Sequence, residues 1–188
     1  MPPKVKVTKD DIINATLRLV QQNGADAINA RSIATALGCS TQPIFSNFES
    51  MEELHQAVLT AAYNLYASTI KEEVTIGKYP PYKAFGMAYI RFAQEERELF
   101  KLLFMRDRQG EDLMPTADFH ASVDMIMAAN HVTKELATRM HLELWTFVHG
   151  IGTMIATSFF SPDWELISDM LTDVYQVLCA RHANVQMA

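Results

Sequence analysis

The chain has 188 residues, of which 49% are hydrophobic and 20% are charged, a composition typical of a soluble globular protein. No stretch approaches the roughly 18 consecutive apolar residues of a membrane-spanning helix, so we expect no such helix. The first eleven residues contain no apolar segment like that of a secretory signal, and we therefore expect a cytoplasmic protein.

The net charge of −6 argues at first against a nucleic-acid partner. The charges are unevenly distributed, however. Residues 1–48 carry five Lys or Arg against three Asp or Glu, a net of +2, whereas the rest of the chain carries eleven against nineteen, a net of −8. A mildly basic head on an acidic body is compatible with DNA contact through one face.

The first predicted helix begins after Thr8, which forms a capping box with Asp11. Apolar residues then recur at helical spacing up to Val20, and Gly24 ends the helix. Asn29 is placed to cap a second helix over residues 30–37, which Gly38 ends.

A third, very short helix is predicted over residues 41–47, with Ser40 as its cap and Pro43 in its first turn. Ser50 and Glu53 form a second capping box, which opens a fourth helix running to about Ile76. The apolar stripe of this fourth helix is predicted to comprise Leu54, Val58, Ala61 and Leu65.

The remainder of the chain is also helical in pattern, and strand signals are absent. Helices are expected around residues 85–92, 99–104, 118–129, 133–159 and 163–182, with Ser161-Pro162 opening the last one and a polar loop over 106–117. We therefore predict an all-α fold with two domains, one over residues 1–50 and one over residues 51–188.

Two short helices joined by the turn Gly38-Cys39-Ser40 form a helix-turn-helix pattern. The outer face of the short helix 41–47 is polar, and a Gln side chain there can pair with adenine in the major groove. The alternative interpretation is a small helical corner with an ordinary solvated surface.

Residues 8–54 contain an ordered set of positions: Gly24, Ile28, Arg31, Ile33-Ala34, Leu37-Gly38, Ser40, Phe45, Phe48, Ser50 and Leu54. In order and spacing, and without gaps, this set resembles the N-terminal domain of the TetR family of bacterial repressors. Two positions depart from the family pattern. Phe45 stands where the family usually has a phosphate-binding Tyr, and Met51 stands where it often has a phosphate-binding Lys.

The resemblance implies that Arg31 and residues 40–42 contact the DNA backbone and bases, with Gln42 as the base reader. A basic N-terminal arm could enter a minor groove, the alternative being a solvated tail. The DNA-binding residues predicted in this way are Lys4, Lys6, Arg31, Ser40, Thr41, Gln42, Phe45, Ser46 and Asn47. Family members bind palindromic operators as homodimers built from their last two helices, here about 133–159 and 163–182.

The resemblance implies that residues 1–50 form the DNA-binding domain and residues 51–188 a helical regulatory and dimerisation domain, similar to the ligand-sensing domain of the family. Residues 89–104 and the element Trp145…His149-Gly150 resemble a subgroup defined by a C-terminal Trp-His-Gly motif. The predicted ligand-binding residues are Tyr66, Phe85, Tyr89, Phe92, Phe104, Trp145 and His149. The alternative interpretation is that these side chains simply fill a core.

The combined interpretation is a ligand-responsive repressor that binds double-stranded operator DNA as a homodimer and is released by a small apolar or amphipathic effector. No catalytic motif, cofactor motif or metal-ligand spacing is present in the sequence. Two alternatives remain open. One is a dimeric helical adaptor with weakened DNA binding, and the other is a redox-responsive regulator using Cys39 or Cys179.

Overall fold

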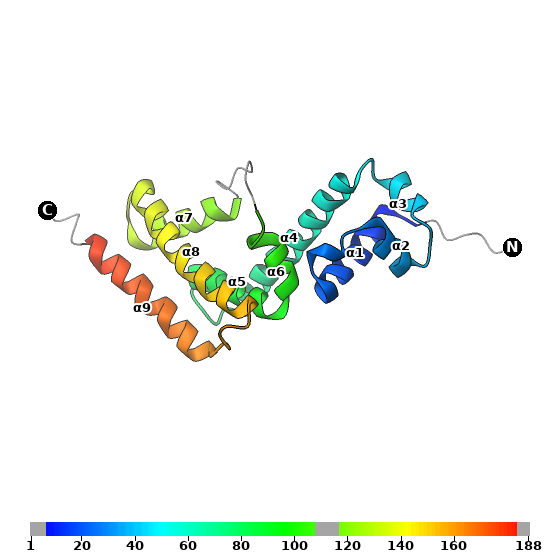
Figure 1. Ribbon diagram of the computed structural model, residues 1–188. Coiled ribbons are helices and arrows are strands. Elements are labelled where there is room, and N and C mark those ends of the chain that lie inside the picture. The colour runs from blue at the N-terminus through cyan, green and yellow to red at the C-terminus, as the bar shows by residue number, and fades with distance from the viewer. Residues whose placement is uncertain (1–6, 108–116, 184–188) are drawn as a thin grey trace. The chain divides into compact units, whose positions relative to one another are not determined.

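The computed structural model describes residues 7–107 and 117–183, and within those ranges the regular structure is entirely helical (Figure 1). The chain divides into two compact units. We call Met1–Ser68 with Glu96–Arg106 the head unit, and Thr69–Glu95 with Asp107–Ala188 the body unit. This architecture confirms the all-α prediction, while the predicted domain boundary after residue 50 remains a prediction.

The head unit is built around helix α1 (Lys9–Asn23), which packs against α2 (Ala30–Leu37), α3 (Gln42–Asn47) and α6 (Arg97–Phe104). A short 3-10 turn, Ala25–Ala27, follows α1, and α4 (Met51–Ile76) contributes its residues up to Ser68. The apolar core of this unit includes Ile12, Val20, Ile33, Ile44, Leu54, Val58, Leu99 and Phe100.

The predicted ends of α1 and α2 are confirmed. The Thr8 hydroxyl accepts a hydrogen bond from the Asp11 amide at 3.1 Å, and the Asp11 carboxylate accepts one from the Thr8 amide at 2.9 Å. Asn29 caps α2 by accepting from the Ser32 amide at 2.9 Å. Gly38 closes α2 in the left-handed region, at φ 63° and ψ 33°, where a side chain would be strained.

The start of α3 differs from the prediction. Thr41, and not Ser40, is the residue that precedes the helix, and its side chain forms no capping hydrogen bond. Thr41 already has helical dihedral angles, φ −73° and ψ −14°, and its carbonyl accepts from the Ile44 amide at 3.1 Å. The prediction that Ser40 caps a helix over residues 41–47 is therefore wrong by one residue.

Helix α4 begins and ends as predicted, but two details differ. The Ser50 hydroxyl accepts from the Glu53 amide, whereas the Glu53 carboxylate bonds the Glu49 amide, so the capping box is only half formed. The predicted stripe fails after Val58, because Leu65 is 37% exposed. The buried stripe instead comprises Leu54, Val58, Ala62, Tyr66 and Ile70.

The body unit contains α5 (Pro81–Glu95), α7 (Ala117–Asn130), α8 (Lys134–Ala156) and α9 (Trp164–Ala183). Helix α5 packs against the other three. Asp163, and not Ser161-Pro162, caps α9, since its carboxylate accepts from the Glu165 and Leu166 amides, each at 3.1 Å. Helix α8 is continuous through Gly150 and ends three residues earlier than predicted.

The core of the body unit is apolar, and the side chains buried in it come from α5, α7, α8 and α9. They include Met87, Ile90, Phe92, Ile126, Met140, Leu144, Ile155 and Ile167. Among the helices formed by residues 7–107 and 117–183, none has the length and hydropathy needed to cross a membrane.

Candidate functional site

Helix α3 has one face in the head core and one face in solvent. Ile44 is fully buried and Phe48, directly after the helix, is 3% exposed, so these two side chains anchor the segment. Gln42, Phe45 and Ser46 lie on the opposite face at i, i+3 and i+4, and all three are exposed. The anchored face thus holds the polar face outward.

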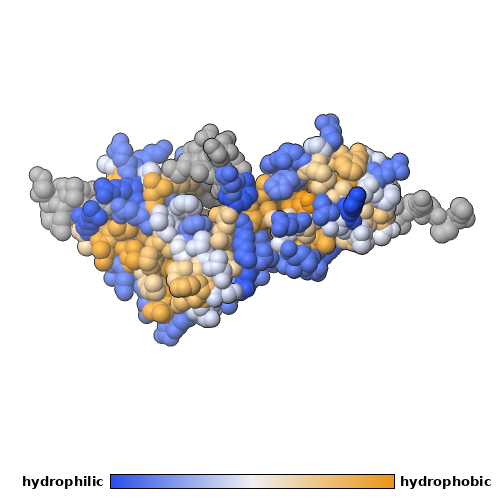
Figure 2. All heavy atoms as spheres, viewed as in Figure 1, coloured by the Kyte–Doolittle hydropathy of each residue, from blue (hydrophilic) through white to orange (hydrophobic). Residues whose placement is uncertain are grey.

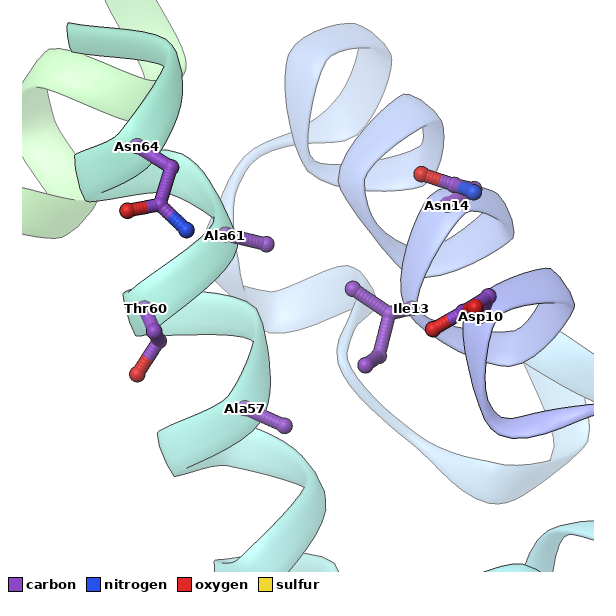
Figure 3. Close-up of a pocket in the computed structure, with 7 residues that line it drawn as sticks. All are labelled: Asp10, Ile13, Asn14, Ala57, Thr60, Ala61 and Asn64. Carbon is purple, nitrogen blue, oxygen red and sulfur yellow. The ribbon is translucent and has the colours of Figure 1, made fainter. Parts of the chain in front are cut away.

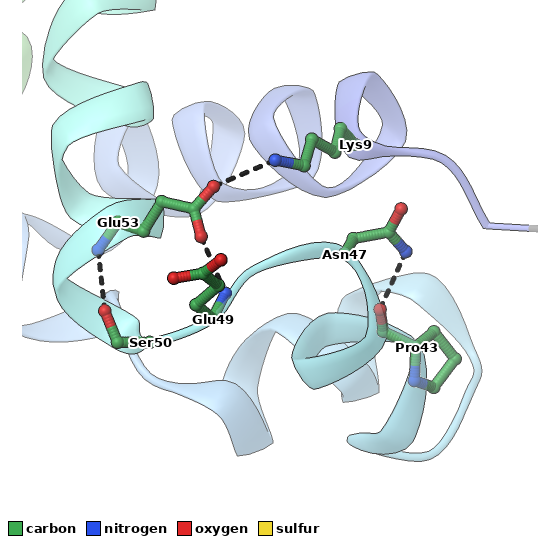
Figure 4. Close-up of polar contacts among 6 residues, drawn as sticks. All are labelled: Lys9, Pro43, Asn47, Glu49, Ser50 and Glu53. Carbon is green, nitrogen blue, oxygen red and sulfur yellow. Dashed lines mark hydrogen bonds and ion pairs between the residues drawn. The ribbon is translucent and has the colours of Figure 1, made fainter.

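The segment between α3 and α4 is fixed by a polar cluster (Figure 4). Lys9 of α1 forms an ion pair with Glu53 of α4 at 2.9 Å, and its ammonium also lies 4.9 Å from the centre of the Phe48 ring. The second carboxylate oxygen of Glu53 accepts from the Glu49 amide. These bonds lower the pKa of Glu53, with the Lys9 contact as the largest cause.

Two of the predicted DNA-binding side chains use their donors within the protein. The Asn47 amide nitrogen donates to the Pro43 carbonyl at 2.8 Å and to the Val7 carbonyl at 3.3 Å, and Asn47 is only half-exposed (Figure 4). The Ser46 hydroxyl donates to the Gln42 carbonyl at 2.9 Å. Asn47 therefore ties α3 to the start of α1, and only its carbonyl oxygen remains for a ligand.

The other predicted DNA contacts lie at or near the surface. Arg31 on α2 and Ser40 in the turn are exposed, and Thr41 is half-buried. Among the described residues, the Arg31 and Gln42 side chains have no hydrogen-bond or ion-pair partner. Lys4 and Lys6 lie outside the described residues.

The seven predicted ligand-binding residues fall into both units. Tyr66 and Phe104 belong to the head unit, where their rings meet edge to face with centroids 5.2 Å apart. The other five belong to the body unit. Phe92 is 1% exposed and Tyr89 is 4% exposed, whereas Trp145 is 44% exposed.

Tyr89, His149 and Trp145 form a contiguous group in the body unit. The Tyr89 hydroxyl is hydrogen-bonded to His149 Nδ1 at 2.7 Å. The Trp145 ring stacks on the imidazole, with ring centroids 5.3 Å apart and an interplanar angle of 20°. Burial lowers the pKa of His149, which favours the neutral imidazole. The structure thus brings together three of the predicted ligand-binding residues, and their role in ligand binding stays a prediction.

Two further polar pairs of the body unit escaped the sequence analysis. Tyr82 is hydrogen-bonded to His141 Nδ1 at 3.0 Å, and burial lowers the pKa of His141 to about 4. Arg91 pairs at 3.1 Å with Glu73, which is 4% exposed. The residues of each pair lie 59 and 18 positions apart, and no local periodicity indicates such contacts.

An open groove of about 470 Å³ lies between α1 and α4 of the head unit (Figure 3). Its walls alternate small apolar and polar side chains, and none of the predicted ligand-binding residues contributes to it. The lining residues are Asp10, Ile13, Asn14, Ala57, Thr60, Ala61 and Asn64.

The described residues contain no cluster of three or more His, Cys, Asp or Glu side chains able to hold a metal ion. Cys39 and Cys179 are free thiols, both half-buried. Burial raises the pKa of Cys179, and its thiol donates to Asn130 Oδ1 at 3.1 Å. A raised pKa disfavours the reactive thiolate, and with it the redox-responsive alternative for Cys179.

Comparisons with known proteins extend over both parts of the chain. Residues 12–58 match the family described as "Bacterial regulatory proteins, tetR family", and residues 82–175 match "Tetracyclin repressor-like, C-terminal domain". A solved structure of a TetR family member from Streptomyces coelicolor A3 is similar in fold, with a TM-score of 0.62 and 18% identity. That similarity covers 88% of this chain and 96% of the other.

No curated protein matches the chain. The matched descriptions name no subgroup, so membership of the Trp-His-Gly subgroup stays a prediction. The two matched segments together span most of the chain, and members of this family are transcription factors without enzymatic activity. The chain therefore belongs to the TetR family, and it is a DNA-binding transcription regulator.

Proposed function

We propose that this regulator is a repressor that binds a palindromic operator as a two-fold dimer and leaves it when a small apolar or amphipathic effector binds. The observation that carries the proposal is the two-faced α3, with Ile44 and Phe48 buried and Gln42 exposed. An anchored helix with outward polar groups suits base reading in the major groove. Arg31 and the turn residues would position α3 by contacts with the DNA backbone.

Exposed apolar surface on α8 and α9 supports the dimer. Figure 2 shows apolar surface over this part of the body unit. Apart from the adjoining residues and backbone of α8 itself, a Cβ added at Gly150 would meet no atom within 4 Å, so α8 is open to close approach there. The large apolar side chains exposed on α8, on α9 and between them are Trp145, Met154, Phe159, Leu166 and Val177. Burying such a surface between two copies is favourable.

The effector site is proposed for the body unit, around the Tyr89–His149 pair and the half-buried Phe85. A neutral imidazole and a phenol hydroxyl give one polar anchor, and the surrounding side chains give apolar contact. The effector would favour a conformation in which α4 pivots, and it would release DNA only to the extent that it prefers that conformation.

Isothermal titration tests the sensing step. The protein would be titrated with a duplex selected from a random pool, with and without saturating members of a panel of aromatic and long-chain amphiphiles. We expect at least one compound to weaken DNA binding by about tenfold or more. His149→Phe should abolish that effect and keep the DNA affinity measured without the compound. A compound that binds with unchanged DNA affinity would contradict release by that compound class.

A helical adaptor with weakened DNA binding is the second candidate. It is favoured by exposed carboxylates around the start of α4, Glu49 just before the helix and Glu52 in its first turn, and by the ion pair of Lys9 with Glu53. A salt titration separates the two functions. A working DNA reader loses affinity log-linearly with salt, with a slope of about −0.9 per neutralised phosphate, and we expect a modest slope per protomer. Salt-independent or undetectable binding to every duplex would favour the adaptor.

A further inference from the structure

Phe45 is the one large apolar side chain on the outward face of α3, within the described part of the chain. It is 54% exposed, while its neighbour Ile44 is fully buried. Phe45 therefore contributes little to the head core, because Ile44 and Phe48 already supply the buried side chains of this segment. The exposed ring lies between Gln42 and Ser46 on the face that would meet DNA, so it is available for an apolar contact there.

The chemistry of the ring limits what that partner is. A Phe ring has no hydrogen-bond donor, so it cannot bind a phosphate oxygen as a Tyr hydroxyl does. Among the groups that the bases present in the major groove, the apolar one is the 5-methyl group of thymine, and Phe is among the side chains that contact it. The ring also lies on the same helix face as Gln42, three residues earlier. A Gln side chain pairs best with adenine.

We propose that Phe45 is a specificity-determining residue that reads the 5-methyl group of one thymine in each operator half-site. The inference rests on the proposed docking of α3 in the major groove. Because Phe45 and Gln42 lie on one helix face, the thymine contacted by Phe45 lies close to the adenine paired with Gln42. The half-site therefore contains an A·T-containing step read by these two residues together.

The test compares a duplex selected from a random pool with the same duplex in which single thymines are replaced by uracil. This exchange removes the methyl group and leaves the hydrogen-bonding edges intact. We expect one position per half-site at which uracil weakens wild-type binding roughly fourfold, and roughly 15-fold when both half-sites are changed, from the value of one buried methyl-sized group.

Three variants assign the effect to the ring. Phe45→Ala should weaken binding to the thymine duplex and show no further loss with uracil at that position. Phe45→Tyr keeps the ring and should keep the uracil effect. Gln42→Ala, on the same face, should lower affinity overall and still respond to uracil. Ile44 anchors the helix in all three, and circular dichroism checks that each variant is folded.

Two outcomes would overturn the inference while leaving DNA binding intact. In the first, selected half-sites lack thymine, or uracil has no effect on the wild type. In the second, Phe45→Ala weakens thymine and uracil duplexes equally, which would mean that the ring packs against the sugar-phosphate backbone. Failure to select or bind any duplex would instead overturn the proposed function together with this inference.

Discussion

The outward face of α3 and the interior of the body unit treat polar groups in opposite ways. On α3, the Gln42 side chain is exposed and has no hydrogen-bond partner among the described residues. In the body unit, two buried polar side chains are paired within the chain, Glu73 with Arg91 and His141 with Tyr82. The first arrangement leaves hydrogen-bonding groups available to another molecule, whereas the second leaves few such groups.

This difference teaches where stability and DNA affinity reside. A buried polar group that loses its partner costs the full desolvation penalty, whereas an exposed one simply returns to water. Substitutions in the body pairs should therefore lower the free energy of unfolding, and substitutions on the α3 face should lower DNA affinity with little change in stability. Single substitutions of each kind test whether stability and DNA affinity separate in this way.

The largest effect is expected for Arg91→Ala, which leaves the Glu73 carboxylate buried without its cation. We expect the free energy of unfolding to fall by about 3 kcal/mol, at the low end for broken buried pairs because Arg91 is 35% exposed. Glu95→Ala is the matched control, since Glu95 is 57% exposed and lies 3.9 Å from Arg91. That control should change stability by at most about 0.5 kcal/mol in urea denaturation. Equal effects of the two variants would contradict the separation.

The second effect concerns acid. His141 has a folded pKa of about 4 against an ordinary value of 6.5, so the unfolded chain takes up the proton first as the pH falls. The stability contributed by the neutral, buried imidazole is therefore present above pH 6.5 and is lost as the pH falls toward 4. We expect this residue to account for about 2 kcal/mol of lost stability between pH 7 and pH 5.

The corresponding variant is His141→Gln, which cannot take up a proton in this range. Its unfolding free energy should fall less steeply with acid than that of the wild type, by the same about 2 kcal/mol at pH 5. Parallel stability curves for the two proteins between pH 7 and pH 5 would show that His141 titrates equally in both states.

The third effect lies on the opposite side of the comparison. Gln42→Ala should weaken operator binding about tenfold, or about 1.4 kcal/mol, through loss of one base-reading side chain. Its melting temperature should stay within about one degree of the wild type, because an exposed side chain contributes little to folding. Gln94→Ala, at another exposed glutamine on α5, is the control and should alter neither quantity. A loss of stability without loss of affinity would reverse the assignment.

The smallest effect is expected for Asn47→Ala, which removes the tie between α3 and the start of α1. The two hydrogen bonds to Val7 and Pro43 predict a stability loss of about 1 kcal/mol in thermal denaturation. Base preference in a panel of operator variants should be unchanged. A changed preference at one base pair would show that Asn47 reads DNA directly.

The local features of this fold were accessible from the sequence, because short side-chain-to-backbone bonds determine them. Thr8 and Asp11 are three residues apart, and Gly38 needs only its own backbone conformation. The α4 stripe was misread because Leu65 and Tyr66 both fit a helical spacing from earlier apolar residues. The choice of Tyr66 depends on Phe104 of α6, 38 positions away in the chain.

The same limit applies to the candidate site. The exposed face of α3 follows from its pattern and from the resemblance to a known family. The engagement of Lys9 by Glu53, 44 residues away, and the inward amide of Asn47 depend on tertiary packing, which single-sequence patterns do not contain. Asn47 is a polar residue on a short surface helix, and the sequence pattern therefore predicted it as a DNA contact.

Selection of binding sites from a pool of random duplexes, by wild type and by Gln42→Ala in parallel, tests the central claim most directly. If paired copies of α3 read base edges, the wild type should enrich an inverted repeat with half-site centres about one helical turn, roughly 10 base pairs, or a multiple of it apart. Gln42→Ala should lose preference at one base pair in each half-site. Enrichment of no inverted repeat by the wild type, or of identical sequences by both proteins, would contradict it.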